Sequence, residues 1–91
     1  MIAQKIKVPC EHLIYKYNNK YDVLDVFIGK FQKSISDELM QGVYEHYDIY
    51  TDELVGISIE NYRSIDKSEL NKVLPFNLNY NYINNKIFTD K

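Results

Sequence analysis

The chain has 91 residues, which is enough for one domain with a single hydrophobic core. Hydrophobic residues make up 45% and charged residues 26% of the sequence, as in folded soluble proteins, and the formal net charge is −2. This charge excludes a strongly basic nucleic-acid binder, and no apolar run approaches the roughly 18 residues of a membrane helix. The single cysteine, Cys10, excludes an internal disulfide and favours a reducing compartment, so we expect a cytoplasmic protein.

Residues 11–29 are expected to form a first hairpin. Between residues 11 and 17 apolar and polar side chains alternate, which is typical of a strand with one buried face. The turn at residues 18–20 contains two Asn residues, and Asn is common in turns because it tolerates positive φ. The second strand, at residues 21–29, places Leu24, Val26 and Ile28 on one face.

A second hairpin is expected at residues 43–62. The segment before it, residues 31–41, lacks a clear period, and we interpret it as a connection with at most one short helical turn. Strands are predicted at residues 43–50 and 54–62, and the second of them alternates most regularly. Its apolar face is expected to pack against that of the 21–29 strand at the centre of the core. This face consists of Val55, Ile57 and Ile59.

Only one helix is predicted, at residues 66–74. Asp66 and Glu69 have the spacing of a capping box, Leu70, Val73 and Leu74 form an apolar stripe, and Pro75 ends the helix. In residues 77–91, apolar or aromatic residues alternate with Asn. The alternation favours an edge strand, whereas the terminal position and the Asn content favour a mobile tail, and both alternatives stay open.

These elements predict an α+β fold in a single domain, residues 1–91, with its core in residues 11–76. The sheet is expected to be antiparallel, with four or five strands arranged as two hairpins, and to be covered by one short C-terminal helix. A sheet this small leaves an edge or a face uncovered, so we also expect self-association as a homodimer.

Two motifs within residues 13–62 resemble a known family. The first is carried by Tyr17 and residues 25–28, and the second by Val43, by the Tyr47 and Asp48 pair, and by the run LVGISI at residues 54–59. Together they resemble the bacterial domain-of-unknown-function family numbered 2283, although Asn18 and Glu53 replace the Asp and Gly usual there. The resemblance implies a small antiparallel sheet with a helix and no defined chemistry. Because such genes sometimes lie beside toxin-like genes, it also implies an antitoxin or immunity role by analogy.

The residues that could carry catalysis or bind metal are few. A strand would place Cys10 and His12 on one face, but with His46 they are the only Cys and His residues, and structural zinc normally takes four such ligands. The acidic pairs, Asp22 with Asp25 and Glu45 with Asp48, are three residues apart, so on a strand their carboxylates point to opposite faces. We therefore expect no catalytic, cofactor or metal site and no enzymatic activity.

A surface for a partner protein is the most specific functional prediction. Tyr44, His46, Asp48 and Tyr50 alternate along one predicted strand, and dense Tyr and His side chains are typical of recognition surfaces, although packing beneath a neighbouring segment is the alternative. The candidate anchors are Tyr44, His46, Tyr50 and Tyr62. Acidic neighbours such as Glu45 and Glu60 disfavour nucleic acid as the partner.

We therefore predict a non-enzymatic protein-binding module of bacterial, plasmid or phage origin. It would block a partner protein, as an antitoxin, an immunity protein or a phage-encoded inhibitor does. The alternative is a small homo-oligomeric accessory or ligand-binding protein.

Overall fold

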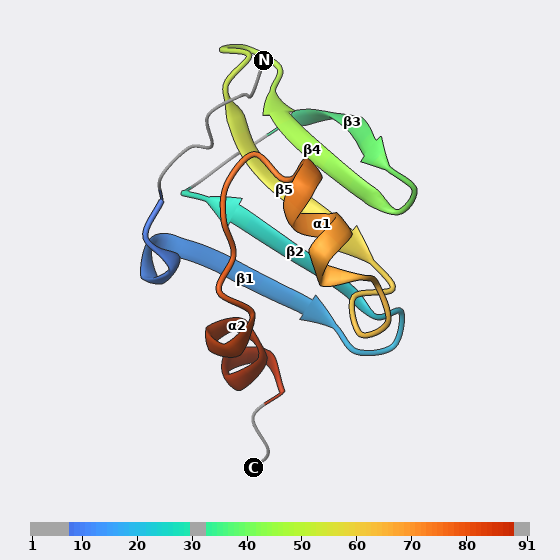
Figure 1. The fold of residues 1–91 in the computed structure, drawn as a ribbon. Helices are drawn as coiled ribbons and strands as arrows, with labels where there is room; N and C mark the ends of the chain where they lie inside the picture. Colours follow the sequence, from blue (N-terminus) through green and yellow to red (C-terminus); the bar gives the residue numbers. More distant parts are fainter. Residues whose placement is uncertain (1–7, 30–32, 89–91) are drawn as a thin grey trace.

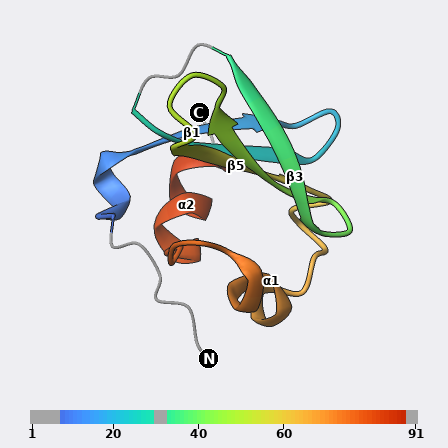
Figure 2. The same ribbon diagram turned by 90° about the horizontal axis from the view of Figure 1, so that it is seen from above.

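The computed structural model describes residues 8–29 and 33–88 of the chain (Figure 1). In these two segments, five antiparallel strands form one sheet in the order β1-β2-β5-β4-β3, and two short α-helices lie on the same side of it (Figure 2). The strands are β1 (Leu13–Asn18), β2 (Val23–Ile28), β3 (Ser34–Met40), β4 (Val43–Asp48) and β5 (Leu54–Glu60). The helices are the 3-10 turn η1 (Cys10–His12), α1 (Lys67–Val73) and α2 (Tyr80–Ile87). None of them is long and apolar enough to cross a membrane.

Both predicted hairpins are present, and they meet through an antiparallel pairing of β2 with β5. This pairing places Leu24 opposite Ile59 and Val26 opposite Ile57, and all four side chains are fully buried. The predicted centre of the core is therefore confirmed for these residues. Val55 is buried as well, but it lies at a shift in the β4–β5 register and outside the main core cluster.

The prediction of a connection at residues 31–41 was wrong for most of that segment. Ser34–Met40 forms β3, which pairs with β4 and is an edge of the sheet; residues 31 and 32 lie outside the described part of the chain. Most β3 side chains are exposed, so burial imposes no alternation of apolar and polar residues on this strand. Backbone pairing with β4 determines its structure instead, and Gly42, at φ 83°, allows the tight turn between the two strands.

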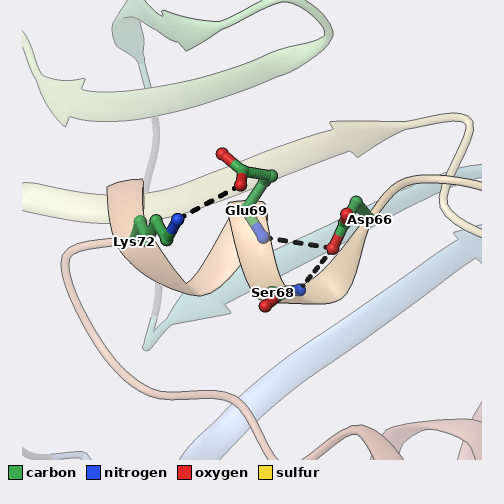
Figure 3. A network of polar contacts seen from close by, with 4 residues as sticks. All are labelled: Asp66, Ser68, Glu69 and Lys72. Carbon is green, nitrogen blue, oxygen red and sulfur yellow. Dashed lines mark hydrogen bonds and ion pairs between the residues drawn. The ribbon is translucent and has the colours of Figure 1, made fainter.

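Helix α1 forms where it was predicted (Figure 3). The Asp66 side chain caps it by accepting hydrogen bonds from the backbone N–H groups of Ser68, at 2.9 Å, and Glu69, at 3.3 Å. Glu69 does not complete a capping box, because its carboxylate pairs with the Lys72 ammonium at 3.2 Å. Buried Leu70 and Leu74 anchor the helix to the core.

A second helix, α2, was not predicted, and it replaces both the edge strand and the mobile tail proposed for residues 77–91. Its N-cap is Asn79, whose side-chain oxygen accepts from the N–H of Tyr82 at 3.0 Å. Leu78 and Ile83 flank the cap and belong to the core cluster, and this spacing is that of a hydrophobic staple. The core therefore extends to Ile83, beyond the predicted limit of residue 76. Residues 89–91 lie outside the described part of the chain.

Candidate protein-interaction face

Within residues 8–29 and 33–88, no helix covers one face of the sheet, and we call it the open face (Figure 2). Its side chains follow from the register, because directly paired residues point to the same side of a sheet and the side alternates along each strand. Leu24, Val26, Ile57 and Ile59 point toward the helices, so their neighbours in the strands point away. The open face therefore contains Ile14, Lys16, Val23, Asp25, Phe27, Ser36, Glu38, Tyr44, His46, Ser58 and Glu60.

A chain of hydrogen bonds crosses the open face over four strands. The Ser36 hydroxyl lies 2.7 Å from Nδ1 of His46, Nε2 of His46 lies 2.6 Å from the Ser58 hydroxyl, and Ser58 donates to the Asp25 carboxylate. Since the Ser58 proton is directed to Asp25, the Ser58 oxygen accepts a hydrogen bond from Nε2–H of His46. Nδ1 of His46 in turn accepts a hydrogen bond from the Ser36 hydroxyl. This arrangement fits a neutral imidazole, and partial burial lowers the pKa of His46, while the Asp25 charge acts in the opposite direction.

The order of this chain differs from that of a Ser-His-Asp catalytic triad. In a triad the carboxylate holds the imidazole, and the imidazole removes the proton from the serine hydroxyl. Here Asp25 holds the Ser58 hydroxyl, and serine hydroxyls occupy both nitrogens of His46. The geometry favours a structural role for this hydrogen-bond chain. It joins β2, β5, β4 and β3 and fixes the orientation of the His46 ring.

Two aromatic side chains lie beside this polar chain. Phe27 packs over Gly56: a Cβ atom at Gly56 would lie 2.7 Å from Cδ1 of Phe27, so only glycine permits the ring to come this close. The Phe27 and His46 ring centroids are 6.4 Å apart. Tyr44 is partly exposed, and the charges of Glu60 and Glu38 raise the pKa of its hydroxyl.

The structure separates the four candidate anchors. Tyr44 and His46 lie on the open face, whereas Tyr50 follows the end of β4 in the turn before β5 and is 73% exposed. In that turn the Asp48 carboxylate accepts from the N–H of Tyr50 at 2.8 Å, so Asp48 serves as a cap for the chain reversal.

Tyr62 is not a surface residue, since only 1% of it is exposed. Its hydroxyl donates to the Asn84 side chain at 2.7 Å, the Lys67 ammonium lies 4.6 Å from its ring centroid, and burial raises its pKa to about 12. The alternation of side chains along the strand predicted at residues 54–62 would instead place Tyr62 on the face away from the core. Asn61, at φ 54°, interrupts that alternation and turns the following side chain into the core.

A shallow depression extends the open face at its β1–β2 end, and the sequence did not predict it. It has a volume of about 470 Å³ and is lined by Asn18, Tyr21, Val23, Asp25, Glu60 and Asn61. Tyr21 is 64% exposed at its rim. The only signal in the sequence was the density of Asn and Tyr around the predicted turns, which does not show that residues 18–25 and 60–61 meet.

The acidic pairs considered in the sequence serve separate structural roles. Asp22 accepts from the Tyr17 hydroxyl at 2.6 Å, whereas Asp25 belongs to the hydrogen-bond chain. Glu45 accepts from the Tyr47 hydroxyl at 2.5 Å, and this bond, with burial, raises the pKa of Tyr47 to about 12.

The proposed strand that would align Cys10 with His12 does not form, because residues 10–12 make a 3-10 turn and β1 begins at Leu13. The side chain of Cys10 lies outside the described part of the structure. Among the side chains that are described, no group of three or more His, Cys, Asp or Glu residues is arranged to hold a metal ion.

Comparison with known proteins gave no match to a family model, a curated protein or a solved structure. The resemblance to the family numbered 2283 therefore stays an expectation from the sequence motifs.

Proposed function

We propose that this protein is a non-enzymatic protein-binding module that blocks a partner by docking its open face on it. The observation that carries the proposal is the one-sided cover of the sheet, since both α-helices of the described segments lie on one side (Figure 2). The other side presents an aromatic and polar surface around Tyr44, His46 and Phe27, residue types that are common in interface centres.

The hydrogen-bond chain supports this proposal because it makes the surface rigid before binding. The His46 ring is held at both nitrogens, so little side-chain freedom is lost when a partner covers it. We propose an antitoxin, an immunity protein or a phage-encoded inhibitor as the biological setting, in a bacterium, plasmid or phage. Each of these acts by covering a surface of its target, and none requires this chain to make or break a bond.

The test begins with capture of a partner from the native host on the immobilised protein, followed by affinity measurements with the purified partner. The double variant Tyr44→Ala with Tyr50→Ala should weaken binding at least about thirtyfold, corresponding to about 2 kcal/mol for a truncated anchor. Lys72→Ala, on the exposed side of α1, is the control and should bind like the wild type. Unaltered binding by a folded double variant would place recognition away from Tyr44 on the open face and from Tyr50 in the β4–β5 turn.

Self-association is the second candidate function, and the position of β3 favours it. In the described part of the chain β3 pairs only with β4, so its outer backbone edge is available to a second copy. Asp37 and Glu38 on this strand oppose such pairing through like-charge repulsion, which is why docking on another protein ranks first. Sedimentation at micromolar concentration decides between the two, because a strictly monomeric species would exclude the homodimer.

A further inference from the structure

We infer that the open face binds a basic segment of the partner, with one arginine or lysine side chain over the ring of Tyr44 between Glu38 and Glu60. This inference rests on the proposed function and adds the chemistry of the partner. We call the three residues the Tyr44 cradle.

The sheet register builds the cradle. Glu38 on β3 is paired directly with Tyr44 on β4, so their Cβ atoms lie about 5 Å apart on the same face. On the other side, β5 places Ser58 opposite Tyr44 and Glu60 one step further along the same face. The N–H of Glu60 donates to the Gly42 carbonyl at 2.7 Å, which fixes the end of β5 against the β3–β4 turn.

The two carboxylates are available to a ligand. Both glutamates are exposed, and across residues 8–29 and 33–88 neither carboxylate takes part in a hydrogen bond or an ion pair. Both act electrostatically on the same phenol, because they raise the pKa of Tyr44, with Glu60 the stronger contributor. A cation placed over the ring would therefore meet the negative face of the aromatic system and two carboxylates together.

The depression beside the cradle is a second contact site for the partner segment. Glu60 borders both sites, and the depression adds Asp25 and the amide side chains of Asn18 and Asn61. Among the charged strand residues that form these sites, three are acidic. Their basic neighbours are Lys16, paired with Asp25 on the open face, and Lys20, whose ammonium lies 5.2 Å from the centroid of the Tyr21 ring in the lining of the depression. A segment with two basic residues can place one in the cradle and the next in the depression.

Charge opposes other occupants of this surface. A second copy would bring its own Glu38 and Glu60 against the same residues, and like charges in contact oppose association. Nucleic acid carries one negative charge per phosphate and would be repelled by the same carboxylates. A basic protein segment is the occupant that complements both the aromatic ring and the acidic rim.

The experiment is a titration of the full chain, followed by backbone amide NMR, with a capped tri-arginine peptide and its tri-citrulline analogue as the neutral probe. We expect tri-arginine to shift the amide signals of Glu38, Tyr44 and Glu60 and tri-citrulline to leave them in place. The double variant Glu38→Gln with Glu60→Gln should bind tri-arginine about fivefold more weakly, since two charge pairs are lost.

The matched control is Asp37→Asn with Glu69→Gln, which removes two exposed carboxylates that do not belong to the open face. Equal weakening by both double variants, or shifts spread over all acidic residues, would overturn the inference, because attraction would then depend on net charge alone. The result is separable from the proposed function. Loss of partner binding in the single variant Tyr44→Ala, combined with an unresponsive cradle, would sustain the docking face and reject a basic partner segment.

Discussion

Ile83→Ala should destabilise the protein strongly, because α2 completes the core. Ile83 is fully buried, and the substitution removes three carbon atoms. At about 0.8 kcal/mol for each buried carbon, with a further term for the cavity, the loss is about 3 kcal/mol. A domain of this length has a total stability of about 5–14 kcal/mol, so this change removes a large part of it.

Urea denaturation followed by circular dichroism measures the effect. With a slope of about 1 to 1.5 kcal/mol per molar urea, the midpoint should fall by about 2 M or more. Asn81→Ala is the control on the same helix, because Asn81 is exposed. The urea midpoint of this variant should differ from that of the wild type by less than about 0.5 M. If Ile83→Ala leaves the midpoint unchanged, α2 does not contribute to the core in solution and the reasoning fails.

Three further predictions concern the open face and the turn beside it. Gly56→Ala should cost about 1–3 kcal/mol, because the new Cβ would lie 2.7 Å from the Phe27 ring, and a wild-type urea midpoint would contradict this. Burial lowers the pKa of His46 below 6.5, so the unfolded chain takes up the proton at a higher pH than the folded chain. The free energy of unfolding should therefore decline below about pH 6.5, and this decline should be smaller in His46→Gln. Parallel pH curves for wild type and variant would refute that assignment. Asp22 has φ 57°, and its carboxylate accepts a hydrogen bond from the Tyr17 hydroxyl. Asp22→Ala should therefore destabilise the protein more than Asp22→Asn, because Asn tolerates this φ. Equal urea midpoints for the two variants would argue against a conformational cause.

The parts of the fold that the sequence predicted are those in which burial repeats with a regular period. Leu24, Val26, Ile57 and Ile59 alternate with polar or small residues because one side of β2 and β5 faces the core, and this alternation is visible without a structure. The Asp66 cap was predictable for a similar reason, since its hydrogen bonds involve residues close in sequence.

The parts that were missed depend on contacts with other segments. Strand β3 is mostly exposed and exists through its pairing with β4, so its sequence has no strand period. In residues 77–88, the alternation of Asn with apolar residues imitated a strand, and the better signal was Leu78 before Asn79 with Ile83 after it, the spacing of a hydrophobic staple.

The candidate site was predictable in part. Tyr44 and His46 lie on the uncovered face that their alternation along β4 suggested. The hydrogen-bond partners of His46 come from two other strands, and the depression joins residues about 40 positions apart, so neither follows from local spacing. Tyr62 was misplaced because a single residue with positive φ, Asn61, reverses the side to which the next side chain points.

The packing of α2 against β1 has a consequence for synthesis of the chain. β1 leaves the ribosome before the helix that covers it, which is made about 70 residues later, and this corresponds to a delay of roughly 4–14 s at ordinary translation rates. During that interval the apolar side of β1, with Leu13, Tyr15 and Tyr17, lacks its cover. A growing chain would therefore depend on chaperones, or on slow pairing of its strands, until Ile83 has been added.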